Sequence, residues 1–131
     1  MSSIFSKIVA GEIPCYKIAE NDEFLAFLDV FPLKRGHVLV IPKQEVDYIF
    51  DIDDATLGNL HIFSKSVAKA IGKVIPCKRV GTAVIGLEVP HTHVHLTPIN
   101  SVGDINFAKP KLTFSHPELA EIAASIAANF V

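Results

Sequence analysis

The sequence predicts one α+β domain over residues 1–131, with an antiparallel sheet of about five strands, one long helix and short N- and C-terminal helices. Residues 53–74 carry apolar side chains three or four positions apart, which is the helical period. Short apolar runs elsewhere are typical of strands. The last two runs are separated only by residues 86–90, short enough for an antiparallel hairpin. A chain of 131 residues can bury a substantial core in one domain.

The first half of the chain predicts a short helix followed by three strands. Ser2 or Ser3 can cap the helix, and Gly11 can close it. Every position from 24 to 28 is apolar, so we expect that strand to be covered on both faces. The three strands are expected at residues 15–19, 23–29 and 37–41, the last one stopped by Pro42.

The second half predicts the long helix, two more strands and a final helix. Asp51 or Asp53 can cap the long helix, and Pro76 ends it. The two strands are expected at residues 80–85 and 91–98, and an irregular stretch follows at 100–114. A capping box that begins at Ser115, with Glu118 as its acidic member, then predicts the last helix.

Composition and charge exclude several classes of protein. Half the residues are hydrophobic and 20% are charged, which is typical of a globular protein. The net charge of −2 gives no general attraction to nucleic acid. Cys15 and Cys77 lie far apart, so ordinary reduced thiols are expected rather than a disulfide. No apolar run is long enough for a bilayer or a leader segment, and we therefore expect a cytoplasmic protein with no membrane partner.

Three of the six histidines alternate at positions 91, 93 and 95 within the last predicted strand. On a strand these side chains would share one face, spaced about 6.6–6.8 Å apart. The opposite face would carry residues suited to a core, namely Thr92, Val94 and Leu96. Burying a row of imidazoles without partners is costly and gives no packing advantage over valine. A chemical role is therefore the better hypothesis.

The histidine row admits three uses. Neutral imidazole is a good nucleophile, so His93, which has a neighbour on each side, could accept a phosphoryl group and release it to water. His91 and His95 would then orient it and stabilise charge on the phosphate oxygens. The same spacing also suits a zinc site. A purely structural role is the third use.

Two further residues are candidates for the site. His37 opens a strand beside Lys34 and Arg35, and it is either an exposed strand-end histidine or a fourth imidazole that contacts a phosphate. Asp29 ends an apolar strand, where it either caps the following turn or accepts hydrogen bonds from the hydroxyls of a ligand. His61 and His116 lie on a helix face and at a helix start, and we expect both to be structural.

Three blocks of the sequence resemble the histidine-triad (HIT) family. Residues 91–97 resemble its His-φ-His-φ-His-φ-φ signature, in which φ is an apolar residue. Residues 4–14 resemble its N-terminal segment, and residues 26–32 followed by 36–43 resemble its nucleotide-side strands. The blocks occur in the family's order and span residues 4–98, about three quarters of the chain. The chain is most similar to small bacterial members of the Hint branch.

The resemblance implies a HIT-like fold and a nucleotide-binding homodimer that needs no cofactor or metal. It implies hydrolysis or transfer at the α-phosphate of purine nucleoside phosphoramidates, dinucleoside polyphosphates or similar AMP- or GMP-type conjugates. By position, His93 becomes the nucleophile that forms a nucleotidyl-histidine, and His91 orients it. His95 and His37 contact the phosphate, and Asp29 accepts the ribose hydroxyls. The base is expected against apolar side chains, namely Ile4, Phe5, Ile8, Ile13, Phe27 and Val30.

The chain departs from the family pattern at two places. Many relatives hold a structural zinc, but three of its four ligand positions carry other residues here, namely Ser3, Ser6 and Glu45. We therefore predict no structural zinc. Leu87 stands where a phosphate-contacting glutamine is usual, although the backbone amides of Leu87 and Val89 could still donate to a phosphate. Two alternatives thus stay open: a nucleotide-binding module without catalysis, and a metal-dependent hydrolase that uses the three histidines as ligands.

Overall fold

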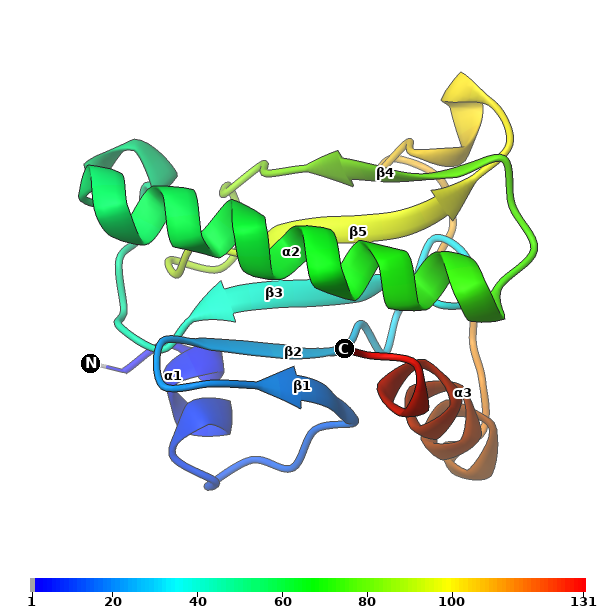
Figure 1. Cartoon of the computed structure of the whole chain (residues 1–131), viewed down its shortest axis with the longest axis horizontal. Helices are drawn as coiled ribbons and strands as arrows, with labels where there is room; N and C mark the ends of the chain where they lie inside the picture. The colour runs from blue at the N-terminus through cyan, green and yellow to red at the C-terminus, as the bar shows by residue number, and fades with distance from the viewer. Residues whose placement is uncertain (1) are drawn as a thin grey trace.

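The computed structural model describes residues 2–131, so expectations for Met1 lie outside the described residues. Five antiparallel strands form one sheet, as the sequence predicts, and the structure gives their order as β1-β2-β3-β5-β4 (Figure 1). The strands are β1 (Lys17–Glu20), β2 (Phe24–Leu28), β3 (Val38–Pro42), β4 (Arg79–Ala83) and β5 (Val94–Ile99). The helices are α1 (Ile4–Val9), α2 (Asp54–Val74) and α3 (His116–Ala128), with 3₁₀ turns at η1 (Ile49–Asp51) and η2 (Val102–Asp104).

Each helix begins where a capping side chain satisfies a free backbone N–H. The hydroxyl of Ser3 accepts from Ser6 N at the start of α1. The carboxylate of Asp53, rather than that of Asp51, accepts from Thr56 N at the start of α2. The capping box of Ser115 opens α3, as predicted. No helix within residues 2–131 is long and apolar enough to cross a membrane.

The predicted start of the last strand is wrong. The ladder of β5 begins at Val94 rather than His91. The backbone N–H of His91 donates to the Val89 carbonyl, and that of Thr92 donates to the Val46 carbonyl. Because the N–H groups of His91 and Thr92 are already hydrogen-bonded outside the sheet, they cannot pair with a neighbouring strand. The chain therefore turns here and joins the sheet only at Val94. His91 and His93 therefore precede the strand that carries His95.

The other strand ends also shift, by one or two residues. Observed β1 begins at Lys17 and not at Cys15, and β4 ends at Ala83 and not at Ile85. Pro42 is the last residue of β3 instead of the residue that stops it. The shifts follow from pairing, since Pro42 lies opposite Phe24 at the end of the β2–β3 ladder.

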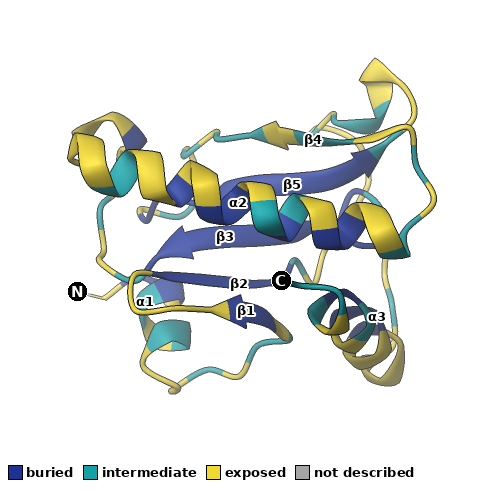
Figure 2. Cartoon of the chain, in the orientation of Figure 1, coloured by how far each residue is buried: buried dark blue, intermediate teal, exposed yellow. Residues whose placement is uncertain are grey.

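Both faces of the sheet are covered, as the wholly apolar β2 predicts. The main core lies between the sheet, α2 and α3 and takes Phe24, Ala26 and Leu28 from β2 (Figure 2). A smaller cluster under α1 contains Leu25, Phe27, Leu39, Ile41 and Phe5. Val94 and Leu96 belong to the main core. His95 lies opposite Leu39 in the ladder and so shares the α1 face of the sheet.

Candidate active site

A cavity of about 610 Å³ opens on the α1 face of the sheet. Its lining comes from α1, the end of β2, residues 85–89 before the histidines, and the segment after β5. His93 and His95 both line it, whereas His91 and His37 lie behind the cavity wall. All the other residues that the sequence predicts for a nucleotide line it as well: Ile4, Phe5, Ile8, Ile13, Phe27, Asp29, Val30, Leu87 and Val89.

Hydrogen bonds fix the protonated nitrogen of His93. Its Nδ1 lies 2.8 Å from the backbone carbonyl of His91. A carbonyl oxygen only accepts, so Nδ1 must carry the hydrogen and Nε2 keeps its lone pair in the neutral ring. The ring packs edge-on against Phe5, with 5.0 Å between centroids. His93 thus presents an unprotonated Nε2 from a held ring, which is what a nucleophile requires.

A chain of hydrogen bonds sets the tautomer of His95. The backbone N–H of Leu33 donates to His37 Nδ1 at 3.0 Å, so the hydrogen of neutral His37 is on Nε2. That nitrogen donates to His95 Nδ1, also at 3.0 Å. His95 must then carry its own hydrogen on Nε2. His95 lines the cavity, and its Nε2–H is the donor that the ring has left after Nδ1 pairs with His37.

Burial keeps this pair of rings neutral. His37 is 1% exposed, which excludes an exposed strand-end histidine. Desolvation is the main reason that the pKa of His37 falls to about 4, with the Lys111 charge adding to it. Desolvation likewise lowers the pKa of His95 to about 3, helped by His37 and His93. Both rings are therefore uncharged donors at neutral pH.

His91 ties α1 to the segment that carries His93. Its Nε2 donates to the Pro42 carbonyl at 2.8 Å, and its Nδ1 accepts from the Ser3 hydroxyl at 2.8 Å. Desolvation lowers the pKa of His91, which keeps this pattern of donors and acceptors in place. Both nitrogens are used inside the protein, so His91 has none left to share a metal with His93 and His95.

Glu45 completes this network. Its Oε1 accepts from the Ser3 backbone N–H and from the Ser6 hydroxyl, each at 2.6 Å. The Ser3 and Ser6 hydrogen bonds lower the pKa of Glu45 to about 2. Ser3, Ser6, Glu45 and His91 occupy the four positions at which relatives are expected to hold zinc. Two hydroxyls and a carboxylate that satisfy one another do not fit a tetrahedral zinc site, which prefers thiolates and imidazoles.

Asp29 caps a turn, which is one of the two uses that the sequence left open, and it also borders the cavity. Its Oδ1 accepts from the Phe31 backbone N–H at 2.9 Å and caps the turn after β2. Its side chain also lines the cavity, with Oδ2 3.7 Å from His37 Nε2. Desolvation raises the pKa of Asp29. Within residues 2–131, the cluster close enough to hold a metal is Asp29, His37 and His95 rather than the three alternating histidines.

The mouth of the cavity is apolar. Several of the chain's exposed apolar side chains surround it: Ile4, Val30, Phe31, Ile85 and Leu87. Leu87 is 87% exposed and Phe31 is 67% exposed. Exposed apolar groups gathered at one cavity are typical of a ligand site, and flat apolar walls suit a planar ring.

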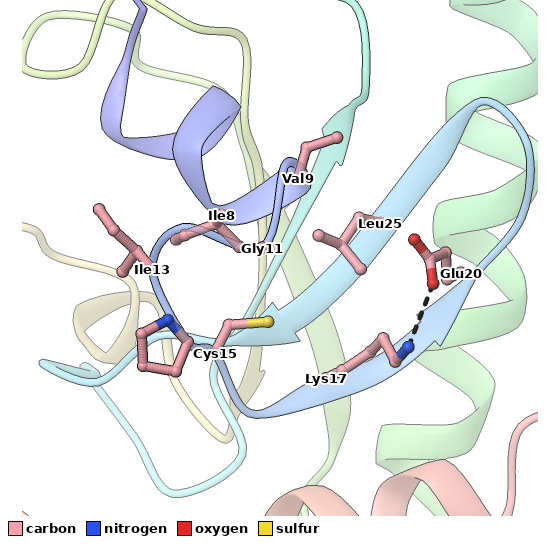
Figure 3. Close-up of a pocket in the computed structure, with 9 residues that line it drawn as sticks. Ile8, Val9, Gly11, Ile13, Cys15, Lys17, Glu20 and Leu25 are labelled. Atoms are coloured by element: carbon pink, nitrogen blue, oxygen red, sulfur yellow. Dashed lines mark hydrogen bonds and ion pairs between the residues drawn. The ribbon is translucent and has the colours of Figure 1, made fainter.

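A smaller hollow of about 310 Å³ adjoins the cavity beside Cys15 (Figure 3). It shares four lining residues with the cavity, namely Ile8, Ile13, Pro14 and Cys15. Desolvation raises the pKa of the Cys15 thiol, which makes it a poor nucleophile at neutral pH. Both cysteines of the chain are free. The hollow continues from the apolar residues that it shares with the cavity to the charged pair Lys17 and Glu20.

Two residues that line the cavity, Phe107 and Lys111, were not predicted from the sequence. The ring of Phe107 lies 4.5 Å from that of His95, measured between centroids. Both residues belong to the stretch predicted as irregular. No periodicity marks them, and only the path of the chain after β5 brings them to the site.

Lowering the pH from 6.5 to 5 should reduce the free energy of unfolding of this protein, because His37 and His95 are buried as neutral rings. His37 and His95 take up protons near pH 6.5 when unfolded, but only near pH 4 and 3 when folded. The unfolded chain therefore binds more protons in this window, so the free energy of unfolding falls as pH falls, by roughly 1–3 kcal/mol per pH unit. Denaturant titrations at pH 7, 6 and 5 measure the slope.

Two variants, His61→Ala and His37→Phe, test whether the buried pair of histidines causes this slope, and the carboxylates with lowered pKa values do not interfere. Glu45 and Asp104, whose pKa values lie near 2, lose their contribution to stability only below about pH 4.5, outside the window. The matched change of the exposed His61 to alanine is the control for the loss of one imidazole. The change His37→Phe should reduce it. A slope that is unchanged in His37→Phe would contradict the buried neutral pair.

Known proteins resemble this chain in both sequence and fold. A HIT domain family model matches residues 10–101. Adenosine 5'-monophosphoramidase hnt1 of Schizosaccharomyces pombe is 40% identical over 99 residues, covering 75% of this chain and 74% of that protein. A Hit-like protein from Bartonella henselae, described as involved in cell-cycle regulation, superposes with a TM-score of 0.84 at 28% identity, covering 98% of this chain and 96% of that one. A Zn-bound histidine triad family protein from Mycobacterium smegmatis has a TM-score of 0.80 at 26% identity, covering 98% and 95%.

Proposed function

The chain belongs to the HIT domain family, and from this premise we propose that it is a nucleotide hydrolase or nucleotidyl transferase. The proposed reaction takes place at the α-phosphate of a purine nucleotide conjugate. The observation that carries the proposal is the unprotonated Nε2 of His93 beside the donor Nε2–H of His95 in one cavity. The phosphoramidase activity in the name of the fungal relative supports the same reaction class.

His93 is proposed as the nucleophile. Its Nε2 forms a bond to the α-phosphorus while the bond from phosphorus to the leaving group breaks. Water then attacks the phosphorus and returns the electron pair to Nε2, which releases a nucleoside monophosphate. The hydrogen bond from Nδ1 to the His91 carbonyl stabilises the positive charge that the ring carries in between. No step requires a metal.

The other histidines support this step from different positions. His95 donates its Nε2–H to an oxygen of the phosphoryl group. His37 has both nitrogens hydrogen-bonded within the protein, so we assign it to fixing the tautomer of His95 instead of touching phosphate. His91 acts on His93 in the same indirect way. Its ring is hydrogen-bonded to the Pro42 carbonyl, which holds the His91 backbone carbonyl in place for Nδ1 of His93.

The remaining lining residues are proposed to bind the nucleoside. Asp29 keeps one carboxylate oxygen for the ribose hydroxyls while the other caps its turn. The base is proposed to lie between the side chains of α1 and β2, namely Ile4, Phe5, Ile8, Ile13, Phe27 and Val30. The backbone amides of Leu87 and Val89 are candidate donors to the phosphate, since both residues line the cavity.

Binding and turnover together test this function. Titration with AMP followed by calorimetry should give saturable binding, and an adenosine phosphoramidate should be converted to AMP by the same protein. Binding without turnover would support the alternative of a non-catalytic nucleotide-binding module. Activity that disappears on chelation and returns with a divalent metal would support the metal-dependent alternative.

We also propose that two copies assemble through β4. This strand ends the sheet, so one of its sides has no neighbouring strand within the described residues. An open edge can pair with the same edge of a second copy and continue the sheet. Sedimentation at micromolar protein would then report a dimer.

The free thiols of Cys15 and Cys77 support a reducing compartment such as the cytoplasm.

A further inference from the structure

Residues 106–112, here called the roof loop, cover the histidines from the side opposite α2. After β5 the chain runs behind the sheet towards α3, as the orange trace in Figure 1 shows. The ring of Phe107 lies 4.5 Å from that of His95 and 6.2 Å from that of His37. The roof loop thus packs against His95, which lines the cavity, and lies close to His37 behind it.

Hydrogen bonds hold the roof loop in one shape. The carbonyl of Asn106 accepts from the Lys109 backbone N–H at 3.1 Å, which closes a turn. The backbone N–H of Leu112 donates to the Pro32 carbonyl at 2.8 Å. Pro32 follows β2 and Asp29, so this bond anchors the loop beside the cavity mouth. A side chain carried by this loop therefore has a defined place relative to the site.

Lys111 is the only lysine or arginine among the described residues that line the cavity. Its ammonium donates to the carbonyls of Phe107, at 2.6 Å, and of Lys109, at 3.1 Å. A lysine has three N–H donors, so one remains for a ligand. The acidic side chains of the lining are Asp29 and Glu88.

The substrate needs this positive charge. A nucleotide brings at least one negative charge into the cavity, and His95 and His37 are neutral there at pH 7. Lys111 is then the fixed cation available to offset it. Electrostatic attraction is strongest for a substrate with further negative charge, such as a second phosphate.

The histidines also limit which groups can leave. An amine departs readily only when it gains a proton, but the Nε2–H of neutral His95 is an unsuitable acid. Losing it would leave an imidazolate unless His37 passed its own proton along at the same moment. A phosphate group departs as an anion and needs no proton. A leaving group that carries its own negative charge therefore needs less help from these histidines than an amine does.

We propose that Lys111 is a specificity-determining residue that binds an anionic leaving group, so that the site favours a P–O–P bond over a P–N bond to an uncharged amine. This inference rests on the proposed function. His93 Nε2 bonds to the α-phosphorus, the bridging P–O bond breaks, and its electron pair stays on the departing phosphate beside Lys111. Water later replaces His93 on the phosphorus and releases one proton to solvent.

The test compares two substrates and four proteins. The substrates are a diadenosine triphosphate and adenosine 5'-phosphoramidate, and the proteins are wild type, Lys111→Met, Lys111→Arg and Lys109→Met. Lys111→Met should lower kcat/KM for the triphosphate at least tenfold and change it less than threefold for the phosphoramidate. Lys111→Arg should recover most of the loss. Lys109→Met, a matched exposed lysine of the same loop outside the cavity, should behave as wild type.

A binding measurement separates this inference from the proposed function. Lys111→Met should weaken binding of ADP more than binding of AMP, whether or not the protein turns over. Equal losses for both substrates, or for both nucleotides, would place Lys111 on the α-phosphate or in loop folding and overturn the inference. No loss at all would also overturn it. If wild type binds both nucleotides and hydrolyses neither substrate, the proposed activity fails, while the ADP-to-AMP comparison still decides the role of Lys111.

Discussion

Replacing His93 with alanine should lower kcat by at least about a thousandfold while leaving the Kd for AMP nearly unchanged. A thousandfold corresponds to about 4 kcal/mol in the activation barrier. The reason is that the change removes the one lining nitrogen whose lone pair the protein leaves free, and with it the covalent route. Steady-state turnover together with AMP calorimetry measures the two effects separately.

The control for this change is a histidine outside the site. His61 is exposed on α2, so His61→Ala should keep both turnover and AMP affinity. Thermal unfolding of His93→Ala should show that the ring is not needed for the fold, since its main contacts are Phe5 and His95 at the cavity edge. A His93→Ala protein that retains more than a tenth of wild-type kcat would rule out the covalent route through this residue.

Replacing His95 with phenylalanine should lower kcat by about a hundredfold to a thousandfold. This is the cost typical of removing one positioned donor to a developing oxyanion. Phenylalanine keeps the ring that packs against Phe107 and removes the Nε2–H that faces the cavity. Substrate KM should change much less than kcat, because the donor matters most when charge builds up on the phosphoryl oxygens.

Two variants of His37, whose ring donates to His95, test whether this hydrogen bond sets the tautomer of His95. In His37→Phe the Nδ1 of His95 loses its donor, so both tautomers of His95 become available and kcat should fall roughly tenfold. In His37→Gln an amide N–H can replace the lost donor, and part of that activity should return. Equal activities of wild type, His37→Phe and His95→Phe would mean that this pair of rings has no part in the reaction.

Local patterns were sufficient to predict the helices. The period of residues 54–74 and the cap at Asp53 fix α2, and the capping box at Ser115 fixes α3. Each signal lies within a few residues of the feature that it predicts. The predicted start of β5 was wrong because the feature that sets it is not local. The bond that turns the chain at Thr92 is made to the carbonyl of Val46, which lies far away in the sequence.

The burial of polar side chains also could not be predicted from the sequence. His37 follows Lys34 and Arg35, so local composition favoured an exposed position. The structure buries it because Leu33 and His95 satisfy both of its nitrogens. Phe107 and Lys111 went unnoticed because an irregular segment carries no periodicity from which its direction could be read. The alternating histidines, by contrast, belong to a local motif, and the family resemblance that this motif carries is confirmed.

The most direct test of the covalent route through His93 is a mass spectrum of the protein caught during turnover. Wild-type protein is mixed with an adenosine nucleotide conjugate, quenched in cold denaturant within the first turnover, and digested. A bond between phosphorus and His93 Nε2 predicts one added AMP on the peptide that contains residue 93, and none on that peptide in His93→Ala. Rapid turnover with no nucleotide on that peptide, or with the nucleotide on another residue, would contradict it.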